Sequence, residues 1–237
     1  MRLDKFLADV GMGTRSEVKR LIHQGAVAVN GSGRISPKQQ IDPKHDVVCC
    51  FGTELHYQKY VYYMFYKPKG CVTARKDKTH KTVMDYIDVG RTDLFPAGRL
   101  DLDTEGLLLI TNDGTLAHNL LSPAKHVRKT YLAKVDGCVG AKEAEAFANG
   151  LDIGDDTPAK PAKLVILSSG EASDVEVTIT EGRYHQVKRM FHAVGREVLA
   201  LKRTAIGDVT LDAALSPGEF RELTKEEEEA LKAGKRE

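Results

Sequence analysis

The sequence has no long apolar segment. None of its hydrophobic runs approaches the roughly 18 residues that a membrane-spanning helix needs, so we predict that the chain does not cross a membrane. The opening residues, Met-Arg-Leu-Asp-Lys, also lack the apolar core of a secretory signal peptide. Both absences predict a cytoplasmic protein.

Cysteine is scarce, and its spacing is uninformative for metals. The four cysteines are Cys49, Cys50, Cys71 and Cys138, and no two of them form a C-x-x-C pair. Adjacent cysteines rarely form a disulfide with each other, so neither a disulfide framework nor a zinc site is predicted. Reduced thiols agree with a cytoplasmic location.

Several catalytic motifs are missing as well. The sequence contains neither G-x-x-x-x-G-K-[ST] nor G-x-G-x-x-G, which argues against folds that bind nucleotide cofactors. It contains neither H-E-x-x-H nor G-x-S-x-G, the motifs of a common zinc site and of serine hydrolases. Any chemistry must come from other residues.

Net charge is almost absent, at +1, but basic residues are unevenly distributed. Residues 67–81 contain six basic side chains and one acidic one, and residues 181–203 contain six and two. Acidic residues gather elsewhere, notably at 226–229, where we predict a solvated helix end. Separated basic blocks indicate a site for a polyanion such as RNA, although charge alone leaves an ordinary solvated surface open.

The first 58 residues are predicted to form a separate small domain of two helices and a β-hairpin. Apolar residues follow helical spacing over 3–10, and Thr14 with Glu17 fits a capping box at the start of a second helix. Residues 26–29 form a predicted strand, and Asn30-Gly31 is a hairpin turn signal.

The second predicted helix has a basic outward face, made of Arg15, Lys19, Arg20 and His23. Such a face suits phosphate contacts along RNA. The alternative for each residue is an ordinary solvated helix surface.

Residues 59–237 are predicted to form a second domain. The predicted strands lie at 61–66, 107–111, 131–135, 163–168, 174–180 and 198–201, and the predicted helices at 141–149 and 185–194. Strands and helices do not alternate strictly, which favours an α+β domain with a mixed, largely antiparallel sheet.

A charged loop between two glycines, at 98–106, contains the strongest candidate for catalysis. It leads directly into the apolar strand at 107–111, and its Asp101 follows Arg99 by two residues. A carboxylate there could act as nucleophile, general base or metal ligand, with Arg99 restraining it or binding phosphate. The alternatives are that Asp101 merely forms a turn, or that Asp103 takes its place.

Two further segments offer partners for that carboxylate. Lys188 lies at the boundary between the apolar and polar faces of the helix predicted at 185–194, from which it could reach a carboxylate. Tyr131, in a predicted strand, could stack on a base pulled from RNA. The alternatives are a solvated lysine and a core tyrosine.

Taken together, these segments resemble a pseudouridine synthase of the RsuA family, and residues 2–31 resemble the small RNA-binding domain that accompanies such enzymes. The matching blocks are Lys-Pro-Lys-Gly at 67–70, Gly-Arg-Leu-Asp at 98–101 with Thr104, 106–108, Thr-Asn-Asp-Gly at 111–114, Lys-Thr-Tyr at 129–131, 182–190, Leu201, Arg203, 206–207 and 215–219. The blocks cover nearly the whole chain in order.

The resemblance implies roles for individual residues. Asp101 would be the essential carboxylate, Lys188 its ion-pair partner, Tyr131 the ring that stacks on the flipped uracil, and Leu201 an apolar wall under the base. The remaining positions expected to bind RNA are Arg99, Arg183, Arg189, Lys67, Lys69, Arg15, Lys19 and Arg20. The family reaction needs neither a metal nor a redox cofactor.

The resemblance also implies a substrate, namely one uridine of small-subunit (16S) ribosomal RNA, free or in an assembly intermediate, modified by a monomeric enzyme. Three alternatives stay open: the same reaction on 23S RNA, a non-catalytic assembly factor that binds ribosomal RNA, and a metal-dependent nuclease. The nuclease would require Asp101, Asp103 and Asp113 to converge on Mg²⁺.

Overall fold

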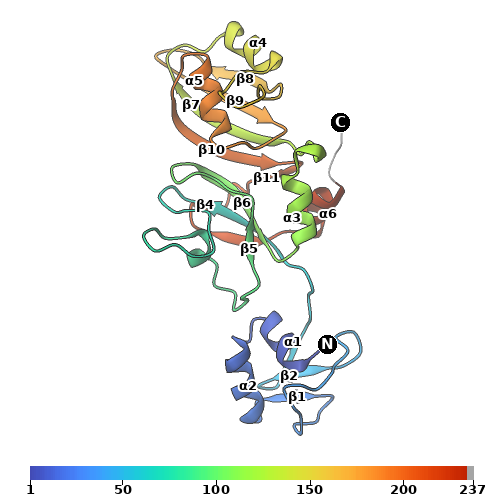
Figure 1. Cartoon of the computed structure of the whole chain (residues 1–237). Coiled ribbons are helices and arrows are strands. Elements are labelled where there is room, and N and C mark those ends of the chain that lie inside the picture. The colour runs from blue at the N-terminus through green and yellow to red at the C-terminus, as the bar shows by residue number, and fades with distance from the viewer. Residues whose placement is uncertain (234–237) are drawn as a thin grey trace. The chain divides into compact units, whose positions relative to one another are not determined.

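The computed structural model describes residues 1–233 and divides into two compact units (Figure 1). One unit comprises Met1–Val61 together with Ile87–Leu94, and the other begins with Tyr62–Tyr86 and resumes at Phe95. Each unit has its own apolar core and is described by itself. Within residues 1–233 no helix is long and apolar enough to span a membrane.

The N-terminal unit consists of two helices and a small sheet. Its elements are α1 (Leu3–Asp9), α2 (Arg15–His23), β1 (Val27–Val29), β2 (Val48–Cys50) and β3 (Thr53–Leu55). The predicted capping box is confirmed, because the backbone N–H of Thr14 donates to Glu17 Oε2 at 2.7 Å and that of Glu17 donates to Thr14 Oγ1 at 3.3 Å. The apolar faces of both helices pack with β1 and β2 in one core.

The hairpin of this unit lies at a different turn from the one predicted. Asn30 and Gly31 do adopt positive φ angles, of 51° and 77°, but the turn closes only a single bridge between Val29 and Ser32. Strand β1 pairs with the distant β2, and the β2–β3 hairpin turns at Phe51 and Gly52 instead. The residues directly after Gly31 are Ser32, Gly33 and Arg34, and no strand forms between β1 and β2.

The larger unit is built on one mixed sheet in the strand order β12-β4-β6-β10-β7-β9-β8. Strand β5 pairs with β6, and β11 pairs with β10. The β6–β10 pair is parallel and the other pairs given are antiparallel, so the predicted α+β class and mixed sheet are confirmed. The strands are β4 (Tyr62–Lys67), β5 (Phe95–Ala97), β6 (Glu105–Thr111), β7 (Lys129–Asp136), β8 (Lys163–Ser168), β9 (Ala172–Ile179), β10 (Val198–Ile206), β11 (Val209–Thr210) and β12 (Phe220–Glu222).

The central strands are buried on both faces. Every residue of β4 is buried, and β6 is buried from Gly106 to its end, as expected of strands covered on two sides. Strand β7 instead alternates, with Lys129, Tyr131, Ala133 and Val135 on its buried face. This alternation places Lys129 and Tyr131 on the same face of the sheet.

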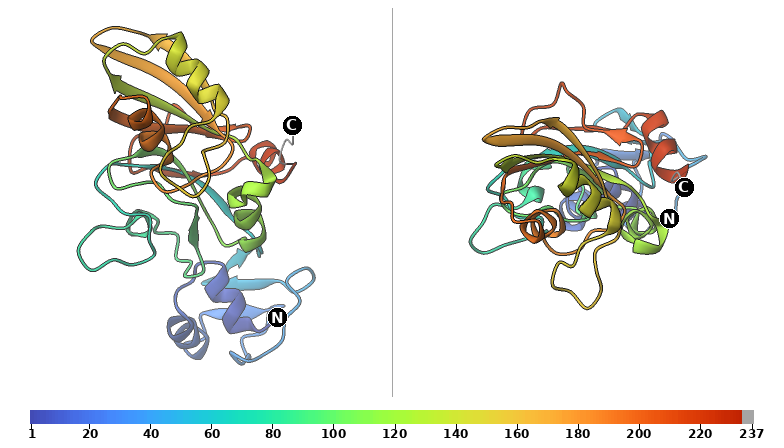
Figure 2. Two further views of the ribbon diagram at one scale, coloured as in Figure 1. Left: turned by 45° about the horizontal axis from the view of Figure 1, so that its top comes forward. Right: turned by 90° about the horizontal axis from the view of Figure 1, so that it is seen from above.

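Helices complete the core at two places. The helical elements are η1 (Val83–Tyr86), α3 (Gly114–Leu121), η2 (Pro123–Lys125), α4 (Ala141–Asn149), α5 (Gln186–Ala193) and α6 (Lys225–Ala233). Helices α3 and α6 lie side by side in Figures 1 and 2 and share a core with β4 and β6. The rings of Phe147 in α4 and Phe191 in α5 lie 4.8 Å apart.

Helix α3 was not among the helices predicted from the sequence. Asp113 is in fact the N-cap of α3, and its carboxylate accepts hydrogen bonds from the backbone N–H groups of Thr115 and Leu116, both at 3.0 Å. An Asp before a helix satisfies N–H groups that have no partner within the helix. Leu116 and Leu120 then bury the inner face.

Candidate active site

One pocket, of about 750 Å³, gathers most of the predicted site residues of the larger unit. Its wall comes from the loop at 98–104, strands β7 and β10, and the segment 182–188 that leads into α5. The predicted residues that line it are Arg99, Asp101, Tyr131, Arg183, Lys188 and Leu201. Lys67, Lys69 and Arg189 do not line it.

The loop that carries Asp101 depends on the two glycines that flank it. Gly98 and Gly106 have φ angles of +99° and +109°, a conformation that other residues rarely adopt. A Cβ on Gly98 would lie 2.8 Å from Leu121 Cδ2, and one on Gly106 would collide with the backbone of Arg203. These glycines let the loop pass close to α3 and to β10.

Lys67 holds this loop through hydrogen bonds to its backbone. This contradicts the prediction that Lys67 contacts RNA. Its side chain is fully buried, and its ammonium donates to the carbonyl oxygens of Asp101 and Thr104 at 2.9 Å and of Pro68 at 3.1 Å. Burial lowers the pKa of Lys67. The prediction of a phosphate contact was wrong, because the side chain extends from a strand that is buried on both faces.

Three further hydrogen bonds fix the loop. The backbone N–H of Gly70 donates to Leu102 O at 2.8 Å, and the hydroxyl of Thr73 donates to Leu100 O at 2.8 Å. The backbone N–H of Leu100 donates to Thr73 Oγ1 at 3.1 Å. The backbone around Asp101 is therefore held in one conformation while its side chain stays free to face the pocket.

Two cationic or polar side chains approach the Asp101 carboxylate. His185 Nε2 lies 3.4 Å from Oδ1, and Lys188 Nζ lies 3.5 Å from Oδ2. Asp101 is partly exposed, at 28%. The structure thus brings together Asp101 and Lys188, as expected, and adds His185, for which no role was predicted from the sequence.

Lys188 is shared with a second carboxylate. Its Nζ donates to Asp103 Oδ1 at 2.6 Å, a shorter contact than that with Asp101. This hydrogen bond lowers the pKa of Asp103, whose side chain is 70% exposed. Asp103 therefore competes with Asp101 for Lys188.

Tyr131 and Leu201 form the apolar wall of the pocket. Both are buried, at 8% and 5% exposure, and they lie on the paired strands β7 and β10. Tyr131 lies directly opposite Arg203 in the register of the two strands. An aromatic ring beside an aliphatic side chain can accommodate a planar base.

Sequence reasoning overlooked the buried cations of this pocket. Lys129 and Arg203 both line it, with exposures of 6% and 4%. Burial, reinforced by the charge of Arg203, lowers the pKa of Lys129 to about 8. The period of two along β7 was the available signal, because it places Lys129 on the face of Tyr131.

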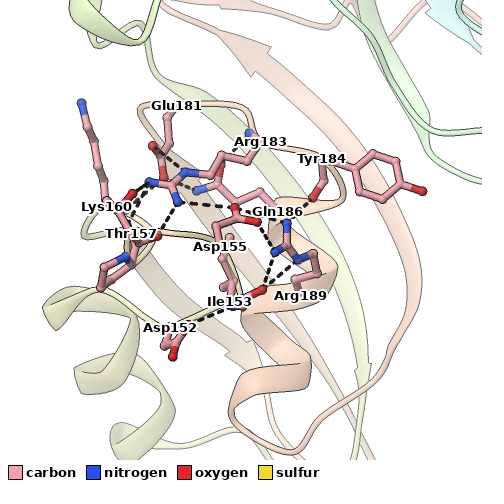
Figure 3. A network of polar contacts seen from close by, with 12 residues as sticks. Asp152, Ile153, Asp155, Thr157, Lys160, Glu181, Arg183, Tyr184, Gln186 and Arg189 are labelled. Atoms are coloured by element: carbon pink, nitrogen blue, oxygen red, sulfur yellow. Dashed lines mark hydrogen bonds and ion pairs between the residues drawn. The ribbon is translucent and has the colours of Figure 1, made fainter.

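Arg183 and Arg189 are committed to contacts within the protein (Figure 3). Arg183 donates to the carbonyl oxygens of Thr157 at 2.6 Å and Pro158 at 2.9 Å, and forms an ion pair with Glu181. Arg189 binds Ile153 O and the carboxylate of Asp155.

These contacts order the loop at 152–158 against the start of α5, and the hydrogen bond from Arg189 lowers the pKa of Asp155. The prediction that Arg183 and Arg189 contact RNA phosphates does not fit this arrangement, because acceptors within the protein already occupy their donors. Their role in the structure is to position α5, and with it Lys188.

The other predicted RNA contacts are exposed. Lys69 and Arg99 are exposed in the larger unit, and Arg15, Lys19 and Arg20 are exposed on α2. Tyr184 adds an aromatic surface that was not predicted. Its ring is 75% exposed at the pocket and stacks on that of His185, with centroids 3.8 Å apart.

The carboxylates required by the nuclease alternative do not converge. Asp113 directs its side chain to the start of α3 and accepts a hydrogen bond from the Tyr62 hydroxyl at 2.8 Å. It does not line the pocket that contains Asp101. The expected set of three metal ligands is therefore not assembled.

Comparison with known proteins shows the family to which the chain belongs. The family model of RNA pseudouridylate synthase matches residues 61–193, and that of the S4 domain matches residues 1–48. The chain belongs to the RNA pseudouridylate synthase family. It is therefore an enzyme whose reaction is the isomerisation of uridine to pseudouridine in RNA.

Individual relatives match almost end to end. An uncharacterised RNA pseudouridine synthase of Bacillus subtilis, YtzG, is 46% identical over 230 residues, covering 96% of each chain. The ribosomal small subunit pseudouridine synthase A of Haemophilus influenzae is 44% identical over 238 residues, covering 98% of this chain and 99% of its own. A crystal structure of a pseudouridylate synthase matches with a TM-score of 0.68 and 42% identity, over 98% of this chain and 99% of the other.

Proposed function

We propose that this protein converts one uridine of small-subunit (16S) ribosomal RNA to pseudouridine and that Asp101 is the essential carboxylate. The observation that supports this most directly is the position of Asp101 in the pocket. A rigid loop presents this partly exposed carboxylate beside Lys188, in a pocket that Tyr131 and Leu201 also line.

The chemistry requires a carboxylate near the sugar and a surface for the detached base. Asp101 can act by adding to the ribose, by adding to the base, or by removing a proton from the sugar. In each case Lys188 orients the carboxylate, and Tyr131 and Leu201 hold the uracil ring while it turns. Tyr131 would also assist removal of the proton from C5.

Binding of the RNA is assigned to both parts of the chain. Residues 1–58 would hold RNA through Arg15, Lys19 and Arg20, and residues 59–237 would hold the target nucleotide. Pulling a uridine out of its stack costs roughly a few kcal/mol, which phosphate contacts from Lys69 and Arg99 would offset. The exposed ring of Tyr184 can stack on a neighbouring base.

The choice of the small subunit rests on the relatives. Proteins named ribosomal small subunit pseudouridine synthase A are 42–44% identical over nearly the whole chain, including the N-terminal unit. Similarity across both units favours the same class of RNA substrate over 23S RNA.

Mapping of pseudouridines in both ribosomal RNAs, from cells with and without this gene, tests the proposal. We expect one site in small-subunit RNA to disappear with the gene and to return with the wild-type protein but not with Asp101→Asn. Loss of a site in 23S RNA alone would overturn the choice of subunit. Full restoration by Asp101→Asn would overturn the role of Asp101.

A further inference from the structure

Lys129 is a buried cation whose ammonium has no polar partner among residues 1–233. It begins β7, is 6% exposed and lines the pocket that contains Asp101. Across residues 1–233 its ammonium forms no hydrogen bond and no ion pair. Burying a charge without compensation is costly, so such a group needs an explanation.

Arg203 lies close by with part of its guanidinium unused. Its Nε donates to the carbonyl oxygen of Leu107 at 2.8 Å, whereas its Nη2 is enclosed and has no acceptor in the part of the chain that the structure describes. Its charge acts on Lys129 and helps to lower the pKa of that lysine. We call Lys129 and Arg203 the buried cation pair.

A structural role does not account for the pair. Lys67, equally buried in the same unit, shows what a structural lysine looks like, because its ammonium donates to three carbonyl oxygens. No carboxylate of residues 1–233 forms an ion pair with Lys129 or Arg203. Two neighbouring buried cations that lack an anionic partner in the described part of the chain are suited to an anion that arrives with the substrate.

The surroundings of the buried cation pair indicate that the anion it binds is a base and not a phosphate. Lys129 and Tyr131 share one face of β7, and Tyr131 is opposite Arg203 across the strand pair. A ring that stacks on Tyr131 would therefore present its edge to the pair. A phosphate keeps most of its oxygens hydrated and would be met by the exposed Arg99.

We propose, building on the isomerase function proposed above, that Lys129 and Arg203 stabilise the uracil anion released when the C1′–N1 bond breaks. The electron pair of that bond moves to N1, and the negative charge spreads over the ring to O2 and O4. Fixed N–H donors in a water-poor pocket stabilise developing charge of this kind strongly.

The step is balanced without a further reactant. After the ring turns, C5 donates an electron pair to C1′ and the C5–C1′ bond forms. In the route through the ribose, the bond between C1′ and Asp101 breaks at this point; in the route through deprotonation of the sugar, Asp101 returns the proton to the sugar. C5 then loses its proton and N1 gains one, which restores a neutral uracil. The two routes in which Asp101 acts on the sugar release the base as a uracil anion. If Asp101 instead adds to C6 of the base, the base departs as an anionic adduct, and Asp101 leaves C6 as C5 loses its proton. The departing base carries negative charge in each route.

The test compares Lys129→Met and Lys129→Arg with the wild type on transcribed small-subunit RNA. We expect Lys129→Met to lower the single-turnover rate of pseudouridine formation by about 10²–10³-fold, the loss typical of one removed oxyanion donor. Lys129→Arg should recover at least part of this loss. Lys134→Met, an exposed lysine of the same strand, serves as the matched control and should leave the rate unchanged.

The affinity for RNA distinguishes whether Lys129 binds the base or a phosphate. For an anion formed only during the reaction, the Kd for RNA and its salt dependence should be the same in Lys129→Met and in the wild type. A weaker Kd together with a salt slope reduced by about one would instead indicate a phosphate contact and would overturn the proposal.

The pH profile gives a second measurement. Because the pKa of Lys129 is lowered to about 8, kcat/KM of the wild type should fall above that pH as the cation is lost, and Lys129→Arg should remove this fall. On β9 the neighbour of Lys129 is the uncharged Ile179. The charged and titratable groups that surround Lys129 or share its pocket are Arg203 from β10, Tyr131 from β7, Asp77, Arg99 and Asp101 from loops, and Arg183, Tyr184, His185 and Lys188 from the segment that leads into α5. These groups are present in both the wild type and Lys129→Arg, so their titration contributes equally to the two pH profiles.

The outcomes distinguish this inference from the function on which it rests. A wild-type protein that forms no pseudouridine in small-subunit RNA contradicts the proposed function. An active wild type with an equally active Lys129→Met contradicts the buried cation pair alone. If Lys129→Met does not fold, identical pH profiles for the wild type and Lys129→Arg would contradict it.

Discussion

Two buried lysines in the larger unit differ in whether their ammonium groups have hydrogen-bond partners. Lys67, beneath the loop of Asp101, donates to three carbonyl oxygens, whereas Lys129, beside Tyr131, has no partner among the described residues. Burial lowers the pKa of both. The difference teaches that burial alone does not identify a functional lysine. The two lysines differ in the number of satisfied N–H donors. The ammonium of Lys67 is satisfied by the protein and holds the loop, whereas that of Lys129 is available to a ligand.

The largest effect on stability should follow removal of the Lys67 ammonium. Lys67→Met leaves the carbonyl groups of Pro68, Asp101 and Thr104 without their donor, in a buried position. We expect a loss of roughly 3–5 kcal/mol in the free energy of unfolding, measured by urea denaturation. A variant as stable as the wild type would show that the loop is held by its other bonds.

Removal of the Lys129 ammonium should have the opposite effect. A folded-state pKa of about 8 against 10.5 in the unfolded chain means that the charged form destabilises the fold at pH 7. Lys129→Met should therefore raise the free energy of unfolding by about 3 kcal/mol at pH 7. Calorimetry or urea denaturation checks this, and a marked loss of stability would show that Lys129 has an unrecognised structural partner.

The same difference should depend on pH with a definite sign. Between about pH 8 and 10.5 the unfolded chain binds more protons at Lys129 than the folded one, so the free energy of unfolding of the wild type rises relative to that of Lys129→Met. The advantage of the variant should shrink across this window and be constant below it. An advantage that is equal at pH 7 and pH 10.5 would contradict the lowered pKa.

A third lysine, Lys188, differs from both because it contacts the carboxylate of Asp101 directly. Lys188→Met removes the cation 3.5 Å from Asp101 and should lower turnover by about 10²-fold through misplacement of the carboxylate. RNA affinity should change only several-fold, as measured by filter binding next to single-turnover kinetics. Unchanged turnover would transfer the orienting role to His185.

The smallest effect is expected at Asp103. Its contact with Lys188 is short but largely exposed, and exposed ion pairs contribute about 0–1 kcal/mol. Asp103→Asn should keep turnover within about threefold, since it frees Lys188 for Asp101. A loss comparable to that of Lys188→Met would mean that Asp103 takes part in the reaction.

The sequence was most informative where local pattern decides structure. The glycines at 98 and 106 marked the loop, and its resemblance to a known family predicted roles for Asp101, Lys188, Tyr131 and Leu201. Those four residues meet in one pocket. The alternating strands and the capping box at Thr14 are also local features, and they were predicted from the same kind of pattern.

Long-range partners could not be predicted in this way. A lysine at the end of a strand looks the same in sequence whether it reaches RNA or three carbonyl groups, so Lys67 was assigned to the wrong surface. The acceptors of Arg183 and Arg189 lie about 26–36 residues away in the chain, in the loop at 152–158. Helix α3 was different, because the Asp113 cap and the spacing of Leu116 and Leu120 were available and were overlooked.

The most direct test of the account is the pseudouridine content of transcribed small-subunit RNA after incubation with the purified protein, without added cofactor, beside Asp101→Asn. We expect one new pseudouridine with the wild type and none with Asp101→Asn, and the Kd values of the two proteins for RNA should agree within several-fold. Pseudouridine formation by Asp101→Asn at the wild-type rate would contradict it.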